Sequence, residues 1–180
     1  MMRITFAVLL LVGAASAQYC SLMGAIIIGQ DKDYTILGVV SFDKYDTASI
    51  MNPYGNYGSK FSAMSIFNTF GDFGSQFSDL SPMNKFALKP PAIVAAIGGE
   101  VYLLGMLSIN KYVLPPAEFS GPTRVIDPNE LVGFLKFGSC SVTANKSRPV
   151  RLSTGKLRNG IDALGRQPHK SPREALIFRR

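Results

Sequence analysis

The stretch that decides the fold reads YDTASIMNPYGNYGSK at residues 45–60, FSAMSIFNTFGDFGSQ at 61–76 and FSDLSPMNKFA at 77–87. Aromatic, serine, asparagine and glycine residues recur in it every 16 positions, and the third copy is truncated. Self-similarity at a fixed period is typical of repeats that stack on one another. Because two and a half copies are too few to stand alone, we expect this segment to pack against a sheet.

Each copy combines residues that favour turns. Asp46, Ser62 and Ser78 are good N-caps for one helical turn. An asparagine later in each copy can bond to the backbone two residues on, and the glycines permit positive φ. We therefore predict one-turn helices joined by tight turns, with Gly58 and Gly74 at positive φ. The predicted turn residues are Asn52, Gly55, Gly58, Asn68, Gly71, Gly74 and Asn84.

Six rings of the repeats are their most prominent side chains. Their i, i+3, i+7 spacing is that of an amphipathic helix, but glycine directly after two of every three rings argues against a continuous helix. We predict that the rings point inward and stack copy upon copy as core. The alternative is an exposed face that stacks on sugars or binds a protein. These rings are Tyr54, Tyr57, Phe61, Phe70, Phe73 and Phe77.

Apolar runs on either side of the repeats predict hairpins. Residues 25–28 and 34–42 flank a polar turn, and residues 92–97 and 100–109 flank Gly98-Gly99, a two-residue hairpin signal. A weaker third pair is 124–126 and 131–137, around Asp127-Pro128-Asn129. A glycine shared by the three second strands (Gly38, Gly105 and Gly133) indicates a bulge or a close backbone approach.

The predicted fold is mainly β: about three hairpins form one sheet, and the 16-residue aromatic and glycine array is inserted after the first. Residues 18–140 make one domain, and residues 141–180 a basic, disordered tail. That tail holds ten Lys or Arg against Asp162 and Glu174, while residues 1–140 hold nine against ten acidic residues. The net charge of +7 therefore belongs to the tail, and nucleic acid is not an expected partner.

Residues 1–17 have the pattern of a cleavable signal peptide. Arg3 precedes an apolar stretch that is too short to span a bilayer, and small residues end at Ala17. We expect a secreted or periplasmic protein without a transmembrane helix after cleavage. In an oxidising compartment Cys20 and Cys140 are expected to form a disulfide; the alternative is two buried free thiols.

One family resemblance is carried by NPYGNYGSKFS at residues 52–62 and by PPAIV at 90–94. The stretch from about residue 34 to 113 resembles small exported bacterial proteins that have tandem N-P-Y-G-x-Y-G-S-x-Y-S repeats followed by a P-P-x-I-V hairpin. The resemblance implies a bacterial, exported origin but no catalytic residue. Thr69 replaces the family's proline, and Phe replaces Tyr at 61, 70, 73 and 77, which favours buried packing over ligand contact.

Recognisable catalytic or cofactor motifs are missing from the sequence. His169, the only histidine, lies in the tail, and no zinc, nucleotide-binding or α/β-hydrolase motif occurs. We expect a non-enzymatic envelope or interaction protein without a cofactor; its partner is open, with envelope polysaccharide and protein both considered. One alternative is a glycan-directed hydrolase that uses dispersed carboxylates; another is a calcium-stabilised repeat. The hydrolase candidates are Asp72, Asp79, Glu100 and Glu118, and the calcium candidates are Asp31, Asp33, Asp72 and Asp79.

Overall fold

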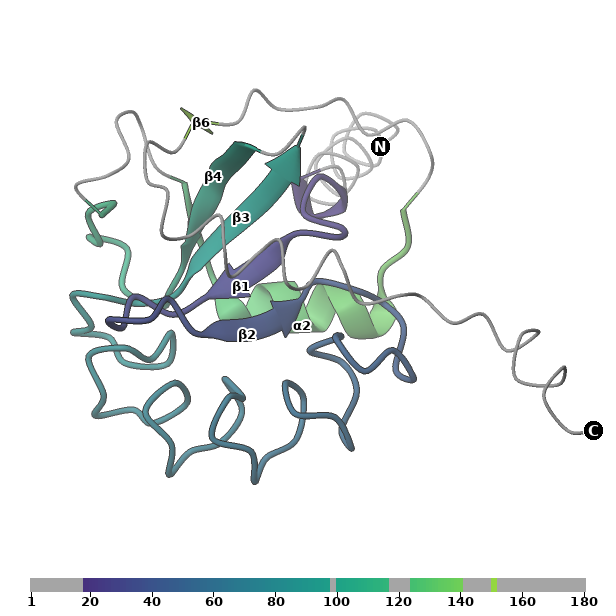
Figure 1. Ribbon diagram of the computed structural model, residues 1–180, viewed down its shortest axis with the longest axis horizontal. Helices are drawn as coiled ribbons and strands as arrows, with labels where there is room; N and C mark the ends of the chain where they lie inside the picture. The colour runs from purple at the N-terminus through teal and green to yellow at the C-terminus, as the bar shows by residue number, and fades with distance from the viewer. Residues whose placement is uncertain (1–17, 98–99, 117–123, 141–149, 152–180) are drawn as a thin grey trace, which may run out of the picture.

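The computed structural model describes residues 18–97, 100–116 and 124–140, together with the backbone of 150–151. The protein is mainly sheet (Figure 1), with strands in the order β2-β1-β3-β4-β5 and β6 also paired with β4. The predicted signal peptide, Glu118, His169 and most of the predicted tail lie outside the described residues. The elements are β1 Ile26–Ile28, β2 Ile36–Val39, β3 Ala92–Ile97, β4 Glu100–Leu107, β5 Val125–Ile126, α2 Pro128–Phe137 and β6 Val150–Arg151.

Two of the three predicted hairpins are present. β1 pairs antiparallel with β2, and β3 pairs antiparallel with β4. The register shifts beside Gly38 in the first pair and beside Gly105 in the second, which confirms the bulges expected there. Gly38 has a φ of +114°, and a Cβ on it would lie 2.7 Å from Cβ of Tyr57. A Cβ on Gly105 would lie 2.6 Å from the Arg124 carbonyl oxygen.

The third predicted hairpin is wrong. β5 is a short strand parallel to β4, and the segment expected to return as its partner is helix α2. Asp127 caps this helix by accepting a hydrogen bond from the Asn129 N–H, Pro128 opens it, and Leu131 and Leu135 are buried one turn apart. The residues interpreted as a hairpin turn are a helix start, because proline is well tolerated in the first turn of a helix.

Residues 45–87, here called the turn segment, contain no helix and no strand beyond a single bridge at Ser49. Backbone N–H groups donate to the carbonyl three residues earlier, step after step, as in Ser65 to Ser62 and Asn68 to Ser65. Once in each of the first two copies the step is four residues, from Ser59 to Gly55 and from Ser75 to Gly71. The predicted one-turn helices are thus replaced by a series of tight turns, which Figure 1 shows as successive loops along one side of the sheet.

One side of every copy packs against the sheet. Ser49, Ser65 and Ser81 are fully buried at equivalent positions, and each hydroxyl oxygen accepts a backbone N–H two residues on. Ile50 and Ile66 follow the first two serines and join a core that also contains residues of β1, β2, β3 and α2. The first copy is attached to β2 by the parallel bridge between Ser49 and Val39. The turn segment therefore forms a layer on the sheet.

The N-terminal end of the described chain is held against α2. The predicted disulfide is present, with the Cα atoms of Cys20 and Cys140 separated by 5.5 Å. The Tyr19 hydroxyl donates to Glu130 at 2.6 Å, and burial together with this carboxylate raises the pKa of Tyr19 to about 12. Burial likewise lowers the pKa of Arg124, whose Nη2 donates to the Gln18 carbonyl. No described helix has the length and apolarity that a membrane span requires.

Candidate binding face

The six predicted rings divide into an outer and an inner set. Tyr54, Phe61, Phe70 and Phe77 are 93 to 97% exposed, so the expectation that all six point inward is wrong for these four. Phe73 is 8% exposed and belongs to the core, and Tyr57 packs partly buried against it. Tyr57 and Phe73 stand at equivalent positions of their copies, and each lies three residues after an outer ring.

Three further exposed rings extend the outer set beyond the six predicted ones. Tyr45 begins the first copy, Phe86 lies in the truncated third, and Tyr112 follows β4. Tyr112 is brought to the third copy because the Ile109 N–H donates to the Pro82 carbonyl and the Asn110 side chain donates to the Ala87 carbonyl. We call these seven exposed rings the ring face. Its members are Tyr45, Tyr54, Phe61, Phe70, Phe77, Phe86 and Tyr112.

Every residue of the ring face is held by the same local hydrogen bond. Its backbone N–H donates to a side-chain oxygen two residues earlier, at distances from 2.8 to 3.3 Å. Such bonds give the backbone a turn that does not depend on packing of the ring. The acceptors are Asp43, Asn52, Ser59, Asn68, Ser75, Asn84 and Asn110.

This common bond is the signal that could have identified Tyr45, Phe86 and Tyr112 from the sequence. An Asp, Asn or Ser two positions before an aromatic residue marks all seven exposed rings. Tyr57 and Phe73 differ, because Gly55 and Gly71 stand two positions before them and have no side chain that can accept the bond. Phe67, which packs partly buried against the core, shares the bond through Ser65, so the pattern marks turns and does not by itself mark exposure. Outside the turn segment and Tyr112, the only exposed ring among the described residues is Phe137.

The predicted asparagines form the turn bonds expected of them, whereas Gly58 and Gly74 are needed for a different reason from the one predicted. Asn52, Asn68 and Asn84 each accept the predicted bond and also donate to a carbonyl six residues earlier. Gly58 and Gly74 do not have positive φ, so that prediction is wrong. A Cβ there would lie 2.2 Å from the Asn52 carbonyl oxygen or 2.3 Å from that of Asn68. Gly55 and Gly71 lie close to the side chains of Asn52 and Asn68.

The candidate carboxylates are only partly brought together. Asp31 and Asp79 line one pocket of about 550 Å³ with Lys32 and Lys89. Each carboxylate already accepts a backbone N–H, from Thr35 and Leu88 respectively. Asp72 is exposed and lines neither this pocket nor the two described next. Within the described ranges no three His, Cys, Asp or Glu side chains gather as a metal site would need.

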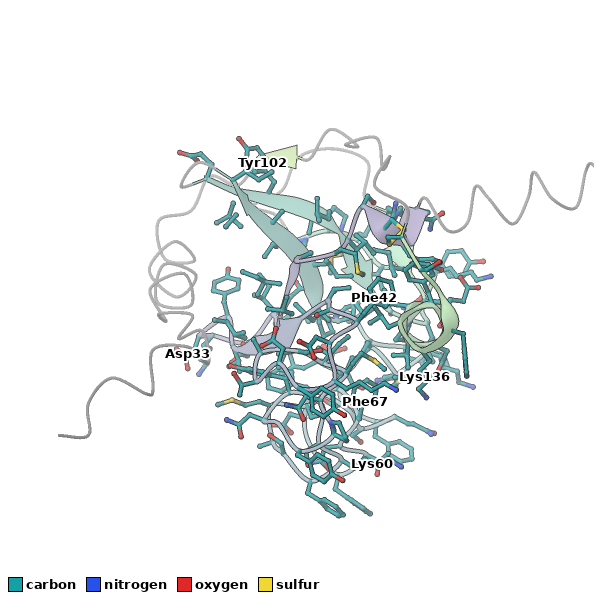
Figure 2. The ribbon with its side chains drawn as sticks, turned by 90° about the vertical axis from the view of Figure 1, so that its right-hand side faces the viewer. Asp33, Phe42, Lys60, Phe67, Tyr102 and Lys136 are labelled. Carbon is teal, nitrogen blue, oxygen red and sulfur yellow. A yellow bond between two sulfur atoms is a disulfide. The ribbon has the colours of Figure 1, made fainter. Side chains whose placement is uncertain are left out.

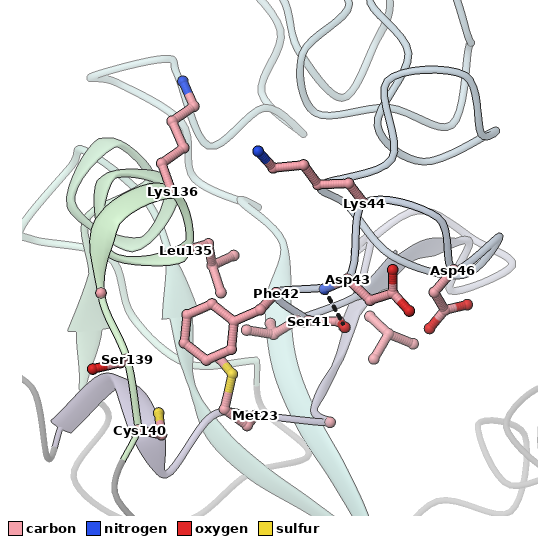
Figure 3. Close-up of a pocket in the computed structure, with 14 residues that line it drawn as sticks. Met23, Ser41, Phe42, Asp43, Lys44, Asp46, Leu135, Lys136, Ser139 and Cys140 are labelled. Atoms are coloured by element: carbon pink, nitrogen blue, oxygen red, sulfur yellow. Dashed lines mark hydrogen bonds between the residues drawn. The ribbon is translucent and has the colours of Figure 1, made fainter.

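A larger pocket of about 880 Å³ lies between the start of the turn segment and the C-terminal end of α2 (Figure 3). Its lining mixes charges: Lys44 and Lys136 stand on one side, and Asp43 and Asp46 on another. Phe42 fills the middle and packs at 5.5 Å, centroid to centroid, on Phe134. Both aspartates accept backbone N–H groups, so they serve the turns that hold Tyr45 and Ala48.

The third pocket is lined mainly by residues of the turn segment, together with Ile109 and Asn129, and we call it the ring pocket. Its volume is about 970 Å³, and two exposed rings, Phe77 and Phe86, are among its lining residues. Lys60 and Lys85 line it as well, while no Asp or Glu does. Figure 2 shows Lys60 at the outer end of the turn segment, where ring side chains project away from the sheet.

No protein-family model, curated protein or solved structure matches the chain.

Proposed function

We propose that the protein is an exported, non-enzymatic binding protein of the cell envelope or its surroundings, and that the ring face is its binding surface. The observation that carries this proposal is the exposure of seven rings, each held by its own side-chain-capped turn. Six of the seven rings belong to the turn segment and Tyr112 is held beside it. Large apolar side chains that gather in water commonly mark an interaction site.

Export is supported by the disulfide and by the signal-like N-terminus. The Cys20–Cys140 bond joins the two ends of the domain, and bonds of this kind persist mainly outside the reducing cytoplasm. Two of the hydrolase candidates are poorly placed for catalysis, because Asp79 already accepts the Leu88 N–H and Asp72 lines none of the three described pockets. A glycosidase needs two carboxyl groups that face each other across the bond to be cleaved.

The binding proposal is tested by co-sedimentation of the purified full chain with washed, insoluble envelope material from bacterial cells. A variant with Tyr54, Phe61, Phe70 and Phe77 all changed to Ser is expected to lose at least tenfold in binding. Phe137→Ser is the matched control, because it removes an equally exposed ring that lies outside the ring face. Equal binding by the quadruple variant and the wild type would overturn the proposal, as would hydrolase activity that is lost in Asp72→Asn.

A separate measurement tests export. When the chain is produced with its N-terminus intact in a bacterial host, the extracytoplasmic protein is expected to begin at Gln18. Mass spectrometry without reduction is expected to find Cys20 linked to Cys140. A chain that retains residues 1–17 in the cytoplasm, with both thiols free, would contradict export.

A further inference from the structure

We propose that the ring pocket binds acidic polysaccharide, with rings stacking on sugar units and lysines pairing with their carboxylates. This inference rests on the proposed function and names its ligand class. It starts from the lining of the pocket, which combines two exposed rings with two cations and no acidic side chain. Small-molecule sites typically have this mixture of apolar walls and a few placed polar groups, in volumes of about 300 to 1,000 Å³.

The rings supply surfaces on which a sugar can stack. Phe77 and Phe86 come from different places in the 16-residue copy, and both are largely exposed. A side chain that is 94% exposed, as Phe77 is, cannot be covered by its neighbours. The apolar C–H face of a pyranose is a suitable cover for such a ring, because its hydroxyl groups stay in water at the rim.

The two lysines supply the preference for an anion. Neither Lys60 nor Lys85 forms an ion pair with another described residue, and the Lys85 ammonium lies 5.1 Å from the centroid of the Phe86 ring. A cation beside a stacking ring fits a sugar that carries a carboxylate next to its apolar face. Charge-assisted hydrogen bonds of this kind are about twice as strong as neutral ones.

Uncharged polar groups complete the lining. Thr69, Gln76 and Asn129 line the pocket, and their side chains form no hydrogen bond to another described residue. Hydroxyl and amide groups can both donate and accept, as sugar hydroxyls require. Asn84, by contrast, is already used by Phe86 and Ser78.

The pairing of a lysine with a ring recurs beyond the pocket, which favours a polymer over a single sugar. A lysine directly precedes the ring at Lys44-Tyr45, Lys60-Phe61, Lys85-Phe86 and Lys111-Tyr112. All four lysines are exposed. A chain of repeating charged sugars would meet several such pairs, so weak contacts would add through multivalency.

The probe is polygalacturonate, and its fully methyl-esterified form serves as a neutral polymer of the same backbone. Affinity is measured for the full chain by calorimetry at two salt concentrations. We expect binding to polygalacturonate that weakens with added salt, and at least tenfold weaker binding to the ester. Equal affinity for the two polymers would overturn the inference.

Three double variants separate binding in the pocket from attraction by the overall charge. Lys60→Gln with Lys85→Gln is expected to lose tenfold or more in affinity, and so is Phe77→Ser with Phe86→Ser. Lys89→Gln with Lys136→Gln removes the same charge outside the pocket and is expected to change affinity less than twofold. Equal losses in both lysine pairs would show attraction by net charge alone, and would overturn the inference.

The outcomes also distinguish failure of this inference from failure of the proposed function. If the ring variants lose envelope binding but the wild type has no affinity for polygalacturonate, the inference is overturned and the proposed function is retained. Binding to anionic phosphatidylglycerol vesicles in place of polygalacturonate would have the same consequence. Absence of binding to both envelope material and polygalacturonate would end both proposals. Circular dichroism of each variant checks that the fold is retained.

Discussion

Phe70 and Phe73 lie three residues apart in the same copy, yet Phe70 is almost fully exposed and Phe73 is buried. The first copy shows the same contrast, because Tyr54 is exposed and Tyr57 packs partly buried against the core. On a helix, residues three apart share a face, whereas here each successive tight turn can present its side chain in another direction. Position within the 16-residue copy therefore decides whether a ring is core or surface, and spacing between rings does not.

The largest expected effect is that of removing an inner ring. Phe73→Ala is expected to lower the free energy of unfolding by about 3 to 5 kcal/mol, because a buried aromatic side chain leaves a cavity. Urea denaturation followed by circular dichroism measures it. A loss below about 1 kcal/mol would show that Phe73 is not part of the core.

The next largest loss of stability is expected when a closely packed glycine of the turn segment is replaced. Gly74→Ala is expected to cost about 2 kcal/mol, because its Cβ would lie 2.3 Å from the Asn68 carbonyl oxygen and the turn would have to shift. Gly133→Ala is the control, since a Cβ there meets nothing within 4 Å and alanine favours a helix. Thermal unfolding should move in opposite directions for the two variants.

Loss of a turn bond should cost less. Asn68→Ala removes an acceptor for the Phe70 N–H and a donor to the Ser62 carbonyl, which is expected to cost about 1 to 2 kcal/mol. Asn56→Ala, at an exposed asparagine of the first copy, is the control and should be close to neutral. Urea midpoints that coincide for the two variants would contradict the role of Asn68 in the turn.

The smallest effect is expected on the outer face. Phe70→Ala should change the free energy of unfolding by less than about 0.5 kcal/mol, because the ring buries almost no surface. The denaturation experiment used for Phe73→Ala gives the direct comparison. If Phe70→Ala proved as costly as Phe73→Ala, the division into inner and outer rings would be wrong.

The sequence predicted the parts of the fold that depend on local chemistry. The Gly98-Gly99 signal placed β3 and β4 as a hairpin, Gly38 and Gly105 marked bulges, and the asparagines marked turns. It failed at Asp127-Pro128-Asn129, where a turn and a helix start share the same residues. Leu131 and Leu135 are buried in the core that also contains strand residues, and this burial favours the helix there.

The binding face was predicted only as an alternative. The direction of a ring in a chain of tight turns depends on how those turns rotate, which no spacing rule for helices or strands describes. The ring pocket needed the structure as well, because Lys60 and Phe86 are 26 positions apart in the sequence and meet only when successive copies stack.

The two attachments of the turn segment also set how long it can be. Its first copy is tied to β2 through Ser49 and Val39, and its third copy to the chain after β4 through Pro82 and Ile109. Both anchors are attached to strands of the same sheet, so the distance between them is fixed. A fourth copy would add 16 residues between these two anchors, so at least one of the two attachments would have to shift or break.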